Sequence, residues 1–498
     1  AYEHPEHERA SEAGYAALLA RDNAYAAVGP ASAAIPSLVS EEATVLRQLA
    51  LDSRLRFANR WPVDPRAPVV LLSAAEELYA LAQLDDAIAI AGQALQRPEV
   101  LTATQQRTAW VVQAHAQFDL SNYANAEIAY QSALTVSPPG DALTTDLQER
   151  LAASLYEQGR VARDGGDLAT AAGHFLRIGK LAFNSSVHPV ALYDASAALI
   201  NLQRWDQAAV ALENFRQLYP RHQLAAGIAE QLTGVYLQGD RPLAAAAELS
   251  GIANSSDAAT ATSARWQAAK LYSENGDQTA HLQMLETLAN NPATPFDDAM
   301  RAREQLLGIH LKQRDNNAVR YWREAIIAAD ARAGGVRSDY SRTLAARASL
   351  ALAEPLSQYF AALRLTLPLE GSIPAKKNSL ETALAAFERV AEYGIDETST
   401  AATFQIAELY RQFGLALMES ERPANLDELA LEEYEFLLEE QAFPFEEKAI
   451  EIHEINTNRA ASLVYNEWVA RSYQQLARLM PGRYDRGEQR ESLVSQID

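Results

Sequence analysis

The chain has 498 residues, with 65 Asp and Glu against 43 Lys and Arg, so its net charge is −22 and its pI is near 4.9. Nucleic acid and anionic lipid repel a polyanion of this size, and neither is an expected partner. The chain contains no cysteine, which excludes disulfides, thiolate metal ligands and cysteine nucleophiles.

The first predicted elements lie in residues 1–66, which contain two helices over about 8–27 and 41–59. Alanine is abundant in these stretches and throughout the chain, and it is the residue with the best intrinsic helix propensity. The sequence WPVDPRAP at 61–68 predicts a rigid connector, because proline restricts its own backbone and that of the preceding residue. We expect residues 1–66 to form an N-terminal helical cap.

An internal repeat follows the connector. The stretch SNYANAEIAYQSALTVSPPG at 121–140 places Ala126, Tyr130 and Ala133 on one helix face and ends that helix at Pro138. Small residues let two helices approach closely where they cross, and the aromatic ring fills the space beside them. Positions equivalent to Ala126 recur at intervals of 36 to 45 residues over a predicted array at 67–333. These positions are Ala87, Ala126, Ala171, Ala208, Ala244, His281 and Ala318.

This pattern resembles the tetratricopeptide repeat (TPR), a helix–turn–helix unit of about 34 residues, and residues 107–140 match it best, through Trp110 and Ala114 as well as Ala126. The resemblance implies an all-α, right-handed α-solenoid in which the first helix of each unit lines a concave groove. The basic pattern that grips the carboxyl terminus of chaperone peptides is not reproduced, which disfavours a co-chaperone.

Transferring the family's groove positions predicts a partner-binding groove rich in aromatic and cationic side chains, the residue types that carry binding energy at interfaces. The alternative interpretation is that half of these side chains serve packing between neighbouring helices. The predicted groove residues are Tyr156, Arg160, Arg163, Tyr193, Asn201, Tyr236, Trp266 and Lys270.

Residues 334–498 form the predicted C-terminal helical region. After Gly334 and Gly335 we expect a long helix over about 338–365, and then the clearest interruption of the chain at 367–379, a Gly/Lys surface loop. Helices resume at Leu380 and continue as a degenerate repeat pair with its turn at Pro444. A polar tail ends the chain.

The negative charge is concentrated in this region, because residues 379–454 hold 19 Asp and Glu against four basic residues. One interpretation is a solvated acidic helix face. The other is an acidic docking surface that attracts a partner with a basic patch. The candidate docking residues are Glu432, Glu433, Glu439 and Glu440.

No pattern for catalysis, a cofactor or a metal is present: the HExxH, GxSxG, GxGxxG and phosphate-loop motifs are all absent. The nine histidines are scattered, and His453, with Ala449 and Thr457 at helical reach, is predicted to lie on the surface without a second ligand. Paired carboxylates on a helix surface lack the apolar surroundings that raise a pKa for acid–base work. We expect no enzyme, no cofactor and no metal.

The stretches ALEEYEFLLEEQAFPFEEKAIEIHEINTNRA and YNEWVARSYQQLARLMPGRY resemble the C-terminal part of bacterial envelope TPR proteins that accompany TolQ/TolR-like, ExbB/ExbD/TonB-like or gliding-motility components. This resemblance implies a non-enzymatic periplasmic adaptor. A sequence that begins at Ala1 without Met fits a removed leader, with a cytoplasmic location as the alternative. No transmembrane span is expected. The alternative functions are a structural subunit of a larger assembly, or a ligand- or glycan-binding module inside the superhelix.

Overall fold

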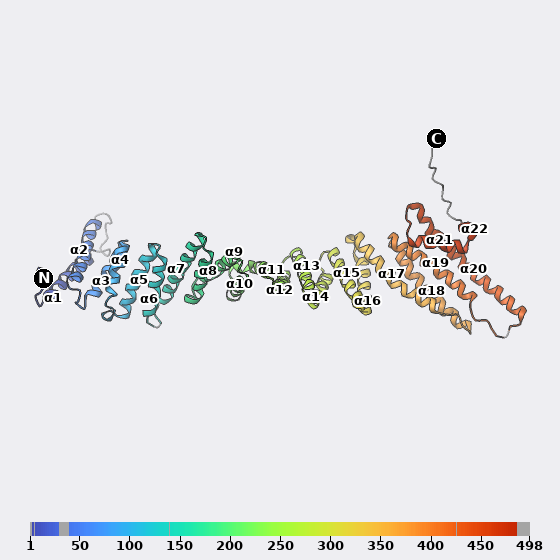
Figure 1. Ribbon diagram of the computed structural model, residues 1–498, viewed down its shortest axis with the longest axis horizontal. Helices are drawn as coiled ribbons and strands as arrows, with labels where there is room; N and C mark the ends of the chain where they lie inside the picture. The colour runs from blue at the N-terminus through green and yellow to red at the C-terminus, as the bar shows by residue number, and fades with distance from the viewer. Residues whose placement is uncertain (1, 4, 29–38, 139, 425, 486–498) are drawn as a thin grey trace, which may run out of the picture. The chain divides into compact units, whose positions relative to one another are not determined.

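The computed structural model describes residues 2–3, 5–28, 39–138, 140–424 and 426–485 (Figure 1). Throughout these ranges the regular elements are helices and no strand occurs, which confirms the predicted all-α helical solenoid. The chain forms two compact units, Ala1–Glu248 and Leu249–Asp498, called unit 1 and unit 2 below. Within the described ranges, no helix combines the length and apolar character needed to cross a bilayer. Residues 486–498 of the predicted polar tail lie outside them.

Unit 1 is a series of antiparallel helix hairpins, preceded by the two predicted N-terminal helices. Short 3₁₀ turns at Pro98–Val100 and Gln223–Gly227 lie between hairpins. α11 is followed by α12 (Pro242–Ser255), the helix in which the division between the units falls. The helices of unit 1 are α1 (Ala10–Val28), α2 (Val39–Arg60), α3 (Ala67–Ala80), α4 (Leu84–Ala94), α5 (Ala103–Asp119), α6 (Tyr123–Val136), α7 (Thr144–Asp164), α8 (Leu168–Leu181), α9 (His188–Asn201), α10 (Trp205–Leu218) and α11 (Ile228–Gln238).

Unit 2 begins with hairpins of similar size and continues with longer helices. Its 3₁₀ turns are Gly334–Val336 and Arg459–Ser462. The helices are α13 (Ala258–Glu274), α14 (Gln278–Asn290), α15 (Phe296–Gln313), α16 (Asn316–Arg332), α17 (Asp339–Ala362), α18 (Leu369–Ala391), α19 (Asp396–Met418), α20 (Glu428–Asn458), α21 (Glu467–Leu479) and α22 (Pro481–Tyr484).

The turn inside each hairpin from α3/α4 to α15/α16 contains one residue with a left-handed backbone, and five residues later comes the residue at the helix crossing. This register corrects two predicted crossing positions. Ala245 and Val319 are buried at the crossings, whereas Ala244 and Ala318 are only half-buried. The left-handed residues are Ala82, Ser121, Gly166, Gln203, Asp240, Gly276 and Arg314. The crossing residues are Ala87, Ala126, Ala171, Ala208, Ala245, His281 and Val319.

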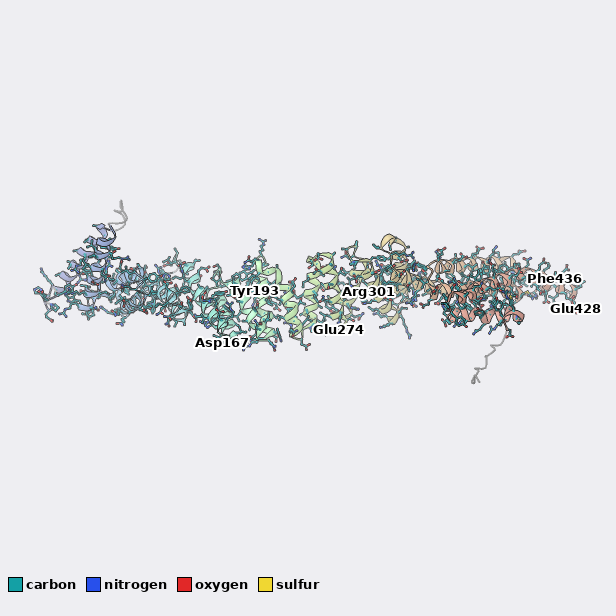
Figure 2. All side chains as sticks on the ribbon, turned by 90° about the horizontal axis from the view of Figure 1, so that it is seen from above. Asp167, Tyr193, Glu274, Arg301, Glu428 and Phe436 are labelled. Carbon is teal, nitrogen blue, oxygen red and sulfur yellow. The ribbon has the colours of Figure 1, made fainter. Side chains whose placement is uncertain are left out.

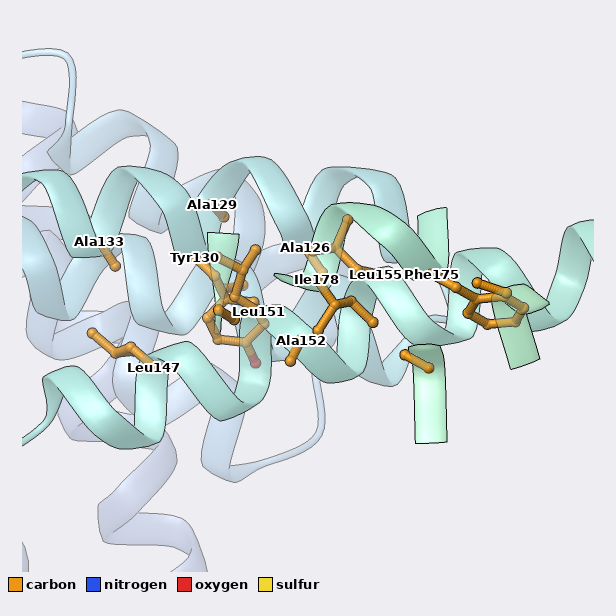
Figure 3. Close-up of a cluster of buried hydrophobic side chains, with 14 of the residues drawn as sticks. Ala126, Ala129, Tyr130, Ala133, Leu147, Leu151, Ala152, Leu155, Phe175 and Ile178 are labelled. Atoms are coloured by element: carbon orange, nitrogen blue, oxygen red, sulfur yellow. The ribbon is translucent and has the colours of Figure 1, made fainter. Parts of the chain in front are cut away.

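The core of unit 1 combines small residues at the crossings with large side chains from neighbouring hairpins (Figure 3). Ala126 and Ala171 are fully buried, as predicted, and Tyr130 and Phe175 fill the space beside them. Burial of such rings and of the leucines between them removes apolar surface from water, which is the main force that holds adjacent hairpins together.

In both units, some first helices of adjacent hairpins contact one another, as α3 does α5 and α7 does α9 in unit 1, and α15 does α17 in unit 2. Within the described residues, the second helices of adjacent hairpins make no comparable contact. First helices therefore lie on the inner side of each unit, in agreement with the placement that the repeat pattern implies.

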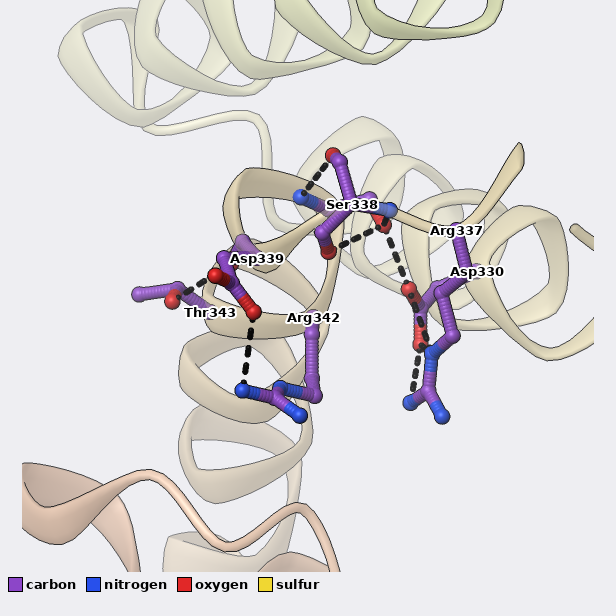
Figure 4. Close-up of polar contacts among 7 residues, drawn as sticks. Asp330, Arg337, Ser338, Asp339, Arg342 and Thr343 are labelled. Atoms are coloured by element: carbon purple, nitrogen blue, oxygen red, sulfur yellow. Dashed lines mark hydrogen bonds and ion pairs between the residues drawn. The ribbon is translucent and has the colours of Figure 1, made fainter. Parts of the chain in front are cut away.

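The predicted break at Gly334 and Gly335 is confirmed, and it is fixed by polar contacts (Figure 4). Arg337 donates to both carboxylate oxygens of Asp330 at 2.7 to 3.1 Å, and Ser338 caps the first turn of α17. The long helix predicted from 338 is also confirmed.

The predicted interruption at 367–379 is wrong, because α18 already begins at Leu369 and contains Pro374. Lys376, expected in a surface loop, is only 3% exposed. Its ammonium group donates to the carbonyl oxygens of Phe360 at 3.1 Å and Leu363 at 2.6 Å. Phe360 lies in the last turn of α17, where its carbonyl also accepts from the Leu363 N–H at 3.2 Å, and Leu363 is the residue that follows the helix. The lysine therefore caps the C-terminal end of α17. Burial lowers the pKa of Lys376.

The predicted turn at Pro444 is also wrong, because α20 runs through it without a break. Pro444 itself is exposed, while Ala442 and Ala449 on either side are buried against the rest of the unit. Packing of α20 along α19 thus outweighs the hydrogen bond that proline removes from the helix.

Candidate partner-binding surfaces

The predicted groove residues lie on first helices, and the structure divides them between the units. Tyr156, Arg160 and Arg163 are on α7, Tyr193 and Asn201 on α9, and Tyr236 on α11, all in unit 1. Trp266 and Lys270 are on α13 in unit 2. Because α7 and α9 contact each other, the structure brings together the predicted groove residues of these two helices on the inner face of unit 1.

Tyrosine hydroxyl groups link consecutive first helices of unit 1. Tyr156 on α7 donates to Asp194 on α9 at 2.7 Å, and Tyr193 on α9 accepts from Gln231 on α11 at 2.6 Å. Burial, followed by the hydrogen bond to Asp194, raises the pKa of Tyr156 to about 12, so its hydroxyl remains a donor at physiological pH. Both rings are half-buried and are held in place with part of their surface accessible.

The cations of the same face are paired with carboxylates. Arg160 donates to Glu157 at 2.8 Å and to Asp164 at 3.2 Å, and Arg163 lies 3.5 Å from Asp194. Both arginine side chains are about 40% exposed. The sequence pattern identified the arginines but not the carboxylates that pair with them. The inner face is therefore less positive than the arginines alone would make it.

The remaining predicted groove residues differ in exposure. Tyr236 is 5% exposed and its hydroxyl donates to Glu213, so its ring packs within unit 1. Asn201 is exposed at the end of α9. In unit 2, Trp266 is half-buried and packs beside the core, while Lys270 is exposed and lies 3.8 Å from Glu274.

The four candidate docking glutamates are exposed on α20. Among the described residues none of the four forms an ion pair, whereas the neighbouring Glu435 lies 3.5 Å from Arg422. Unpaired carboxylates on one helix keep their full charge available to a partner.

A buried polar cluster joins α19, α20 and α21, and the sequence analysis missed it. His453, predicted to lie on the surface, is fully buried, with its Nε2 3.4 Å from Glu408 Oε1 and its Nδ1 3.2 Å from Ser472 Oγ. Asn456 donates to Ser472 at 2.8 Å and to the carbonyl of Thr400 at 3.2 Å. Because Ser472 is fully buried, this acid–histidine–serine series joins helices and offers no nucleophile to a substrate.

The register of α20 contained the signal for this cluster. Leu438, Ala442 and Ala449 mark the buried face, and the same helical spacing leads to His453 and Asn456. Burial alone would raise the pKa of Glu408, but the neighbouring His453 and Arg411 outweigh it and hold that pKa below its usual value.

No protein-family model and no curated protein matches the chain. Among solved structures, it is similar to YrrB, described as a TPR protein with an unusual peptide-binding site, at 16% identity and a TM-score of 0.23 over 45% of this chain and 95% of that one. It is also similar to the C-terminal part of a TPR repeat-containing protein from Cytophaga hutchinsonii, at 12% identity and a TM-score of 0.22 over 64% and 97%. A third match is the TPR domain of P58(IPK), at 13% identity and a TM-score of 0.20 over 89% and 96%. At these values the fold assignment rests on the helix hairpins themselves, and they make this chain an all-α helical solenoid.

Proposed function

We propose that the chain is a non-enzymatic protein-interaction scaffold that binds a segment of a partner protein along the inner face of unit 1. The supporting observation is the pair of hydrogen bonds that fixes Tyr156 and Tyr193 on consecutive first helices. Aromatic side chains held in place before binding lose little conformational entropy when a partner arrives.

The chemistry of this face favours an extended, largely uncharged segment. Arg160 and Arg163 already have carboxylate partners, so an anionic ligand would have to compete with Glu157, Asp164 and Asp194. The tyrosine rings offer apolar area, and Asn201 offers amide hydrogen bonds. Such a surface suits a peptide backbone with apolar side chains better than it suits a phosphate or a nucleic acid.

The proposed setting is a bacterial envelope complex, with the chain in the periplasm. The resemblance of the C-terminal stretches to envelope TPR proteins of the TolQ/TolR-like, ExbB/ExbD/TonB-like and gliding-motility systems supports this setting. We retain the functional division into an N-terminal cap at 1–66, a repeat array at 67–333 and a C-terminal region at 334–498 as part of the proposal.

Site-specific photocrosslinking in envelope extract tests the inner face. A crosslinker at Asn201 is expected to capture a partner that a crosslinker at Val210, exposed on the second helix α10, does not capture. Binding of the identified segment to the full chain is then measured by isothermal titration calorimetry. Tyr193→Ala combined with Asn201→Ala should weaken it about tenfold, since interface hot spots have effects of this size.

Val210→Ala is the matched control and should leave affinity unchanged. Melting curves of each variant confirm that the fold is intact. Equal capture from both positions, or equal affinity of the double variant and the unsubstituted chain, would contradict binding at this face.

A further inference from the structure

The sequence of α20 repeats every seven residues. Residues 429–435, 436–442 and 443–449 read LALEEYE, FLLEEQA and FPFEEKA, with apolar residues at the first and third positions and a pair of glutamates at the fourth and fifth. A period of seven keeps each position on nearly one line along a helix, the geometry that two supercoiled helices use to pack together. The helix therefore carries two apolar lines.

The third-position line packs inside unit 2. Leu438 is buried, and the ring of Phe445 lies 4.7 Å from that of Phe413 on α19. Together with Ala442 and Ala449, these residues explain why α20 follows α19 along its length.

The first-position line faces away from α19. Leu429, Phe436 and Phe443 are 76%, 67% and 57% exposed, and we call these three residues the outer seam. At about 100° per residue they lie almost opposite Leu438 and Ala449. Large apolar side chains aligned at a regular period on one helix face are the usual mark of an interaction site.

The outer seam begins on a part of α20 that is less buried than the rest of the helix. From Glu428 to Leu437 no side chain is buried, and Figure 2 places Glu428 and Phe436 at the tip of the ribbon. A helical segment as short as 428–437 gains little stability in water from its own hydrogen bonds and depends on packing. A partner that covers the outer seam would therefore stabilise this helix as well as bury its apolar side chains.

Glutamates flank the outer seam on both sides. Glu432 and Glu439 lie along one edge, and Glu433 and Glu440 lie along the other, all exposed. A second copy of this chain would bring like charges together, and an anionic membrane would meet the same repulsion. A partner helix with lysines or arginines beside its own apolar line would match both the apolar outer seam and the glutamates that flank it.

We propose that the outer seam of α20 binds a basic amphipathic helix of a protein partner, with apolar residues spaced seven apart between flanking Lys or Arg. This inference rests on the proposed scaffold function and adds a second docking surface to it. The apolar side chains of the partner would pack against Leu429, Phe436 and Phe443, while its cations pair with the glutamate rows and fix orientation and register.

The test uses a fluorescent 24-residue helix of Leu and Ala with lysines at the flanking positions, titrated with the full chain in an anisotropy assay. A peptide of the same composition with its leucines scrambled keeps the charge and removes the apolar line. We expect saturable binding of the patterned peptide and at least about tenfold weaker binding of the scrambled one.

Variants of the chain locate the binding. Phe436→Gln should weaken binding about tenfold, whereas Val210→Gln, at another exposed apolar helix position, on α10, should not. Replacing Glu432, Glu433, Glu439 and Glu440 by Gln should slow association and reduce its dependence on salt. Replacing Glu381 and Glu388, exposed on α18, by Gln is the charge control and should have a clearly smaller effect.

Equal binding of the patterned and scrambled peptides, or no effect of Phe436→Gln, would overturn the proposal. So would sedimentation showing a dimer that Phe436→Gln dissociates, or binding to phosphatidylglycerol vesicles that the same change abolishes. Loss of the inner-face interaction through Tyr193 and Asn201 would leave these results unchanged, so the two proposals can fail separately.

Discussion

The inner face of unit 1 and the outer seam of α20 differ in how far the fold prepares them for a partner. On the inner face, Tyr156 and Tyr193 are half-buried and hydrogen-bonded to the next helix. On α20, Leu429 and Phe436 project from a segment without a buried side chain. The first surface is fixed by hydrogen bonds between helices, whereas the second, on our proposal, is completed when a partner helix packs against it.

This difference predicts two kinds of recognition. A prepared surface binds with a small entropic cost and selects partners by shape and hydrogen bonding. A surface completed by its partner tolerates more variation and relies on apolar periodicity and charge. On the two proposals together, one chain would hold two partners of different chemistry.

Asn456→Ala should have the largest effect, because the stability of α20 comes from its C-terminal half. The change removes the hydrogen bonds to Ser472 and the Thr400 carbonyl and leaves buried groups unsatisfied. We expect the free energy of unfolding to fall by about 2 to 4 kcal/mol, measured by urea denaturation. Phe436→Gln and Asn378→Ala, both at exposed positions, should stay within about 0.5 kcal/mol. A similar loss in all three variants would remove the contrast between the two halves of α20.

Gly159→Ala tests how tightly the first helices of unit 1 are held. A Cβ at Gly159 would lie 2.5 Å from the ring of Phe175, so we expect a loss of about 1 to 3 kcal/mol from overpacking. Gly173 on α8 has open space around it, and Gly173→Ala should stabilise the unit by about 0.5 to 1 kcal/mol. Thermal unfolding shows whether each substitution lowers or raises the stability of the chain. Destabilisation by both alanines would show that helix geometry, rather than contact with Phe175, limits these positions.

Tyr156→Phe removes the hydroxyl group that joins α7 to α9 and keeps the ring. The expected cost is about 0.5 to 1.5 kcal/mol, moderated because Arg163 still faces Asp194. Tyr359→Phe, on an exposed tyrosine of α17, is the matched control and should be neutral. If both changes are neutral, the hydroxyl link does not order the inner face.

The smallest expected effect is a pH dependence of stability, and it concerns Glu408, which contacts His453 in the C-terminal half of α20. Because the folded pKa of Glu408 is lowered, its stabilisation is present above the unfolded pKa of 4.5 and is lost as pH falls through the folded value. The stability difference between the unsubstituted chain and Glu408→Gln should therefore shrink from pH 6 to pH 3. Glu388→Gln, at an exposed position, provides the baseline. A difference that stays constant with pH would contradict this role of Glu408.

The sequence predicted the hairpins because their physics is local. Small residues such as Ala126 and Ala171 recur at the crossings, and periodic apolar residues identify the buried faces. The prediction was wrong for Lys376, His453 and Pro444, because the groups that accommodate these residues lie outside their own helices. From the sequence alone, a buried polar residue resembles a surface residue, and a proline within a helix resembles a turn. Only the neighbouring helices show otherwise.

For the candidate surfaces, too, the sequence predicted the local features and not those that depend on neighbouring helices. Exposed glutamates on α20 were predictable from charge alone, and the seven-residue repeat was present in the sequence. The exposure of Phe436 depends on which of the two apolar lines packs against α19, which only the fold determines. Likewise, the pairing of Arg163 with Asp194 depends on the distance between consecutive first helices.

Hydrogen–deuterium exchange on the intact chain tests most directly the claim that one surface is prepared and the other awaits a partner. We predict slow amide exchange in α7 and α9 with and without ligand, since these helices are packed on both sides. Residues 428–437 of α20 should exchange rapidly in the free chain and become protected on addition of the patterned basic helix. Exchange at 428–437 that is as slow as in α7 and α9 before any peptide is added, or that remains rapid at a saturating peptide concentration, would contradict the account.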